Sequence, residues 1–168
     1  MARYALTCAL IALASLSISG STLGGTLQVS AGKSKVVIVE LLNGKQRPDG
    51  TLRGQFRLLL DDVGTDTGTT EIRPQLGATA TVGGQQQQQV AGNDTFTGKK
   101  GTLGITLRGV GVAIQNFDPT KLGYDNEFGT WKVAEGTGLY KGWHGGGRWA
   151  LVGGPTVNNI EWDGTVTH

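Results

Sequence analysis

The chain has 168 residues, of which 38% are hydrophobic, and this length fits one domain. Its net charge is only +2, and its lysines and arginines are scattered along the chain rather than clustered, so we expect no nucleic-acid partner. Glycine contributes 29 residues without a Gly-X-Y period, and prolines number only 4, which excludes a collagen-like chain.

The first residues have the pattern of a secretory signal peptide. Arg3 supplies a positive charge, an apolar run extends over Tyr4–Leu16, and small residues follow. The apolar run is shorter than the roughly 20 residues that span a bilayer, so we expect no stable membrane span after cleavage. We assign residues 1–19 to the signal peptide, with cleavage between 19 and 31, and residues 32–168 to a single β-barrel domain. A secreted or extracytoplasmic protein is the prediction; an uncleaved anchor is the alternative.

Cleavage in this window leaves a chain without sulfur. Met1 is the only methionine and Cys8 is the only cysteine. No disulfide can then stabilise the domain, although export would permit one. Stability must come from a packed core, which a domain of this length can supply.

Short runs of β-branched and alternating residues, separated by glycines, predict strands after the signal peptide. Val36–Leu42 is an apolar run typical of a buried strand. Thr51–Asp61 alternates strictly except at Leu59, with Phe56 on the apolar face and Arg57 on the polar face. Such alternation predicts one buried and one wet face, so Phe56 should lie in the core.

The same pattern continues along the chain. Residues 62–70 are predicted to form a loop, Glu71–Val82 a weaker strand broken near Pro74, and Gln85–Gln89 a loop or a solvent-facing strand. No stretch shows sustained helical periodicity. The remaining predicted strands are Thr102–Val112, Gly129–Ala134, Arg148–Val152 and Ile160–Val166. Regularly spaced short strands predict an all-β fold, an antiparallel barrel of about eight strands, with a β-sandwich as the alternative.

Missing residue types exclude several enzyme classes. No serine follows Ser34, and the only histidines are His144 and His168. A Ser-His-Asp or Cys-His site needs a nucleophile beside a base, so neither is expected. A zinc site needs three or four protein ligands, so we predict no metal site.

No cofactor is predicted either. Gly92–Lys99 is similar to a phosphate-binding loop, but it lacks the first glycine and precedes a strand instead of a helix. Carboxylates remain available for acid–base chemistry, but the sequence does not show which of them converge. The catalytic residues are therefore left unassigned.

The segment Gly136–Gly145, with the sequence GTGLYKGWHG, is the most distinctive local motif. It resembles the dirigent protein motif Gly-Thr-Gly-x-Phe-x-x-Ala-Arg-Gly, with Tyr140 at the aromatic position. The resemblance implies the eight-stranded antiparallel barrel that dirigent proteins share with allene oxide cyclases and many secreted bacterial proteins. Dirigent proteins steer radical coupling, and allene oxide cyclases isomerise a fatty-acid epoxide. We predict a structural turn role for Gly136, Gly138 and Gly145.

These observations predict a secreted, non-catalytic binding protein with an apolar or aromatic-lined barrel cavity. Its partner would be a small apolar or aromatic ligand, bound near Tyr140, Trp143 and His144 at the mouth or a corner of the barrel. Two alternatives remain: a cyclase or isomerase acting by positioning and acid–base groups, and an extracellular structural component with a packed barrel. A shifted pKa inside the barrel would favour the enzyme, and bulky inward side chains would favour the structural component. The sequence makes no prediction of oligomeric state.

Overall fold

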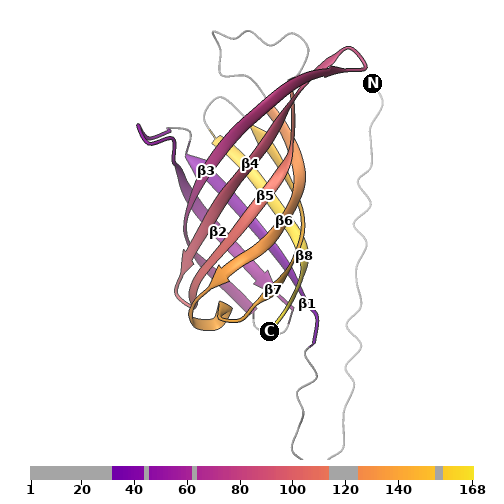
Figure 1. Cartoon of the computed structure of the whole chain (residues 1–168). Coiled ribbons are helices and arrows are strands. Elements are labelled where there is room, and N and C mark those ends of the chain that lie inside the picture. Colours follow the sequence, from indigo (N-terminus) through magenta and orange to yellow (C-terminus); the bar gives the residue numbers. More distant parts are fainter. Residues whose placement is uncertain (1–31, 44–45, 62–63, 114–124, 154–156) are drawn as a thin grey trace, which may run out of the picture.

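A computed structural model describes residues 32–43, 46–61, 64–113, 125–153 and 157–168 of the chain (Figure 1). Eight antiparallel strands form a closed barrel, in which each strand pairs with the next and β8 pairs with β1. The predicted all-β antiparallel barrel is confirmed. The predicted signal peptide lies outside the described residues. The strands are β1 (Ser34–Asn43), β2 (Leu52–Leu60), β3 (Gly64–Val82), β4 (Gln85–Gly98), β5 (Gly101–Ala113), β6 (Asp125–Gly136), β7 (His144–Gly153) and β8 (Val157–Thr167).

The strands alternate between an apolar interior and a largely polar outer face. In β2, Phe56 and Leu58 are at most 4% exposed, whereas Arg57 is exposed. Leu59, the exception to the predicted alternation, follows the strand geometry and lies outside, 41% exposed. Successive side chains of a strand point to opposite faces, so the two-residue period places Phe56 and Leu58 inside and their neighbours Arg57 and Leu59 outside.

The region around β3 and β4 differs from the sequence-based prediction. The predicted loop at residues 62–70 is wrong for Gly64–Thr70, which belongs to β3 and pairs with β2. Gln85–Gln89 forms the start of β4. The sequence-based prediction allowed a strand only over these glutamines and missed the rest of β4, as far as Gly98. The cause is that the inward positions of β4 include Gly92 and Asp94, which interrupt the apolar alternation.

The longest strands, β3 and β4, continue beyond the barrel as a two-stranded ribbon (Figure 1). The pairing of β2 with β3 ends at Ile72, and the ribbon turns at Gly83 and Gly84 with φ angles of 59° and 82°. Positive φ at both central residues is the requirement of a tight two-residue hairpin. This ribbon marks the upper end of the barrel in Figure 1, and the C-terminus marks the lower end.

Two glycines, Gly109 and Gly164, make room for tryptophan rings. The side chain of Trp131 crosses the neighbouring strand, and its indole N–H donates to a backbone carbonyl of β8 at 3.0 Å. The Trp149 side chain likewise crosses β6, and its indole N–H donates to the backbone carbonyl of Arg108 in β5 at 3.3 Å. A Cβ at Gly164 or Gly109 would approach the Trp131 or Trp149 ring, respectively, to 2.8 Å. Each tryptophan thus lies in a row with two glycines: Trp131–Gly147–Gly164 and Trp149–Gly129–Gly109.

A connected set of aromatic rings occupies the barrel centre. The ring centroids of Phe56 and Phe96 are 5.2 Å apart, those of Phe96 and Trp162 are 6.0 Å apart, and those of Trp162 and Trp149 are 5.8 Å apart. All four side chains are at most 4% exposed. Offset and edge-to-face contacts of this kind stabilise beyond simple burial. The interior at this level is therefore filled by side chains.

Candidate functional site

The segment that carries the dirigent-like motif lies at the lower end of the barrel (Figure 1). A three-residue 3-10 helix, η1 (Gly138–Tyr140), connects β6 to β7. Tyr140 is fully buried, and its ring meets that of Trp143 edge-on at 4.8 Å. Trp143 is 5% exposed. His144, the first residue of β7, is exposed. The structure therefore places two of the three predicted ligand-binding residues in the core and the third outside.

The Tyr140 hydroxyl donates a hydrogen bond of 2.6 Å to Oδ2 of Asp66. Asp66 lies near the start of β3, is 4% exposed, and also accepts the backbone N–H groups of Thr67, Lys99 and Lys100. Burial alone would raise the pKa of Asp66, but the hydrogen bonds from Tyr140 and these amides lower it below its usual value. Burial, together with the Asp66 carboxylate, raises the pKa of Tyr140. This cluster, the Tyr140–Asp66 lock, ties β3, the β4–β5 turn and η1 together.

The three predicted turn glycines have local geometries that exclude a side chain. Gly138 has a φ of 57° and Gly145 a φ of 143°, both in the region that favours glycine. A Cβ at Gly136 would collide with the backbone carbonyl of Tyr140. The motif therefore forms a compact corner that seats Tyr140 against the barrel.

Two acidic side chains lie in the middle of the apolar interior. Glu40 of β1 is 0% exposed and Asp94 of β4 is 1% exposed. Oε2 of Glu40 accepts the indole N–H of Trp162 at 3.1 Å, and Oδ1 of Asp94 accepts the hydroxyl of Thr70 at 2.6 Å. The remaining oxygens, Oε1 of Glu40 and Oδ2 of Asp94, are buried without a donor. The two carboxyl groups lie within hydrogen-bonding reach of each other.

Burial determines the ionisation of this carboxyl pair. Desolvation, followed by the charge of Asp94, raises the pKa of Glu40 well above its usual value. Desolvation also raises the pKa of Asp94 to about 7, against the lowering effect of the hydrogen bonds from Thr70 and from protonated Glu40. Ionising both of two adjacent carboxyl groups in a low-dielectric interior has a high free-energy cost, so at least one of them has a raised pKa. Raised carboxyl pKa values of this kind cluster at functional sites, although structural networks produce them too.

The sequence analysis did not identify this pair, although one signal was present. Glu40 occupies an inward position in the run Val36–Leu42, where the other inward side chains are Val36, Ile38 and Leu42. An acidic residue in the apolar register of a strand indicates a buried carboxyl group. Asp94 offered no comparable signal because the alternation of β4 was obscured by its own polar residues.

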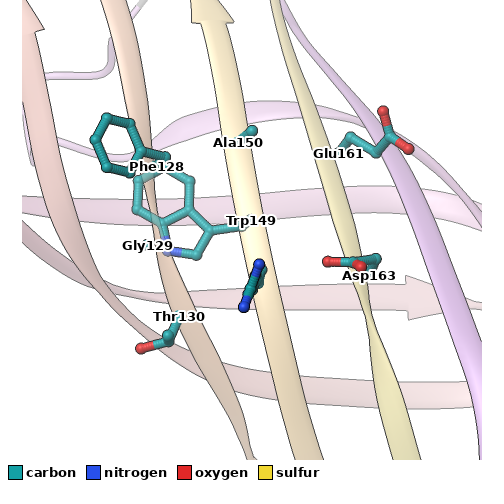
Figure 2. Close-up of a pocket in the computed structure, with 8 residues that line it drawn as sticks. Phe128, Gly129, Thr130, Trp149, Ala150, Glu161 and Asp163 are labelled. Atoms are coloured by element: carbon teal, nitrogen blue, oxygen red, sulfur yellow. The ribbon is translucent and has the colours of Figure 1, made fainter.

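A groove lies on the outer face of β6, β7 and β8, with a volume of about 580 Å³ (Figure 2). Phe128 of β6, 51% exposed, lies at one side, and Glu161 and Asp163 of β8 lie at the other. Ala150 of β7 sits between them, in register with both Phe128 and Glu161. The short alanine side chain leaves the hollow open. We call this the outer groove.

A second row of cross-strand neighbours lines the outer groove and includes a positively charged side chain, Arg148. Thr130, Arg148 and Asp163 are cross-strand neighbours on β6, β7 and β8. Arg148 and the carboxylates are exposed, so their hydrogen-bonding groups are available at the surface. An aromatic face flanked by a guanidinium and carboxylates can hold a ligand that combines a flat apolar face with polar edges.

No family model, curated protein or solved structure matches this chain. The resemblance of Gly136–Gly145 to the dirigent motif therefore stays a prediction. Within the described ranges, no three His, Cys, Asp or Glu side chains form a group that could hold a metal ion. Nor does any helix in those ranges have the length and hydropathy to cross a membrane.

Proposed function

We propose that this chain is an exported, non-catalytic binding protein that holds a small ligand in the outer groove. The supporting observation is the contrast between the two faces of the barrel wall. The aromatic residues of the barrel centre are at most 4% exposed, whereas the outer groove offers about 580 Å³ beside an exposed phenylalanine. Small-molecule sites are concave and usually preformed, so a binding function fits the outer groove better than the filled interior.

The ligand class follows from the groove chemistry. The Phe128 ring presents an apolar face, and aromatic side chains are common in the lining of small-molecule sites. Arg148 and Glu161 lie within the same hollow and can donate to and accept from a polar edge. A small, flat, apolar or aromatic molecule with a hydroxyl group satisfies both features.

Amide NMR titration with a neutral aromatic alcohol, such as naphthol, tests the proposal. Chemical-shift changes should concentrate at Phe128, Arg148 and Glu161. Phe128→Ser should weaken the apparent affinity by about tenfold or more, equivalent to about 1.4 kcal/mol. The matched control is Leu59→Ser, which removes a side chain of similar exposure, 41%, from β2. Equal loss in both variants would indicate nonspecific adsorption.

Two other functions are outcomes of the same titration. Shifts centred on Glu40 and Asp94 would indicate an interior site, as a cyclase or isomerase using this carboxyl pair would require. Both groups are at most 1% exposed, so a substrate there would have to displace packed side chains. The absence of any shift at saturating naphthol would favour a structural extracellular component with a packed barrel, which the bulky inward side chains also support.

A further inference from the structure

We propose that Glu40 and Asp94 share one proton between Oε1 and Oδ2, and that loss of this proton at alkaline pH loosens the barrel. The protein is then a pH-responsive fold that is favoured in acid. This inference is independent of the outer groove and concerns a carboxyl pair that the proposed function does not use.

The buried oxygens Oε1 of Glu40 and Oδ2 of Asp94 need a proton between them to be hydrogen-bonded. Each carboxyl group has one oxygen with a donor, from Trp162 or from Thr70, and one buried oxygen without any. Ionised carboxyl groups are acceptors only, so two facing carboxylates would leave both free oxygens unsatisfied. One proton on either oxygen makes a donor for the other and satisfies both groups at once.

Among the described residues, no basic side chain neutralises the pair from any strand around it. The inward neighbours are apolar or hydroxyl-bearing: Phe56 on β2, Thr70 and Ile72 on β3, Ile105 on β5 and Ile160 and Trp162 on β8. No described lysine, arginine or histidine is buried. In the part of the chain that the structure describes, the other inward ionisable groups are the Tyr140–Asp66 lock at the lower end and Glu127 near Gly111 at the upper end. A shared proton is thus the remaining way to compensate the pair.

The direction of the pH dependence follows from proton binding. The unfolded chain releases these protons at its ordinary carboxyl pKa values, near 4, whereas the folded barrel retains them to higher pH. Between these limits the folded state binds more protons, so stability falls as pH rises. With the pKa of Asp94 at about 7, linkage at Asp94 alone predicts about a hundredfold rise in the unfolding equilibrium constant between about pH 5 and pH 8, and the raised pKa of Glu40 adds to this rise.

Two isosteric variants remove the shared proton while keeping the hydrogen bonds. In Glu40→Gln the amide N–H₂ donates to Asp94, and its carbonyl oxygen still accepts from Trp162. In Asp94→Asn the amide donates to Glu40, and its oxygen still accepts from Thr70. Both variants should show a smaller rise in the unfolding constant than wild type over the same pH interval, because each removes one of the two carboxyl groups whose pKa is raised. Asp61→Asn, an exposed carboxyl change at the end of β2, should keep the wild-type dependence.

Denaturant unfolding at about pH 5 and pH 8 is the primary measurement. A wild-type unfolding constant that stays level or falls with rising pH would overturn the proposal, as would variants with the wild-type slope. If either variant fails to fold, infrared titration of the wild-type protein tests whether the carboxyl pair holds a proton. A carboxylic-acid carbonyl band should be present at about pH 5 and should lose intensity as the pH rises through neutrality into the alkaline range. Its absence at acid pH would also overturn the proposal.

Discussion

Replacing Tyr140 by phenylalanine removes a single hydroxyl group from the Tyr140–Asp66 lock. The hydroxyl donates to the Asp66 carboxylate at 2.6 Å, and both residues are buried. A hydrogen bond to a charged group contributes about 1.5–3 kcal/mol to stability. Asp66 keeps three backbone N–H donors, so the lower part of this range applies. Tyr140→Phe should therefore reduce the free energy of unfolding by about 1.5–2 kcal/mol at neutral pH.

The pH dependence provides a second test of the same bond. Because the hydrogen bonds hold the pKa of Asp66 below its usual value, the folded state binds fewer protons here than the unfolded chain. The stabilisation is complete above the unfolded pKa, near 4, and is lost as the pH falls through the folded pKa. The difference between wild type and Tyr140→Phe should therefore shrink at strongly acid pH.

Urea unfolding at neutral and acid pH measures both effects. Lys141→Ala is the control because it changes the adjacent, exposed residue and should cost under about 0.5 kcal/mol. A Tyr140→Phe variant as stable as wild type at neutral pH would refute the hydrogen-bond reasoning. So would a difference that grows as the carboxylate is protonated.

Three further predictions use simpler readouts. Phe56→Ala should destabilise the barrel by about 3–5 kcal/mol through lost burial and a cavity, whereas Arg57→Ala should cost under about 0.5 kcal/mol; denaturant melts in the reverse order would contradict the strand register. Gly138→Val should lower the melting temperature because its φ is 57° and a Cβ there would collide with a backbone carbonyl; unchanged calorimetric melting would refute this. The exported protein should lack Met1 and Cys8, and an intact mass that includes both would disprove signal cleavage.

Local pattern was sufficient to predict the all-β class and much of the barrel. The period-2 alternation of β2 predicted that Phe56 is buried and Arg57 exposed, since neighbouring side chains of a strand must point to opposite faces. The glycines Gly138 and Gly145 correctly indicated a turn with positive φ, whereas the glycine-containing segment Gly64–Thr70 was wrongly predicted as a loop and belongs to β3. Where the inward residues were polar or glycine, as in β4, the same reasoning missed the strand.

Tertiary structure alone decided which side chains meet. Tyr140 and Asp66 are 74 residues apart in sequence, and Trp162 and Glu40 are 122 residues apart, yet each pair is hydrogen-bonded. The motif around Tyr140 indicated a corner, but the barrel register determined that Tyr140 and Trp143 point inward while His144 points out. The position of Glu40 beside Asp94 depends on β1 and β4 facing one interior after closure of the sheet. Alternation records only which face of its own strand a residue occupies, whereas closure of the barrel sets its distance to residues on every other strand.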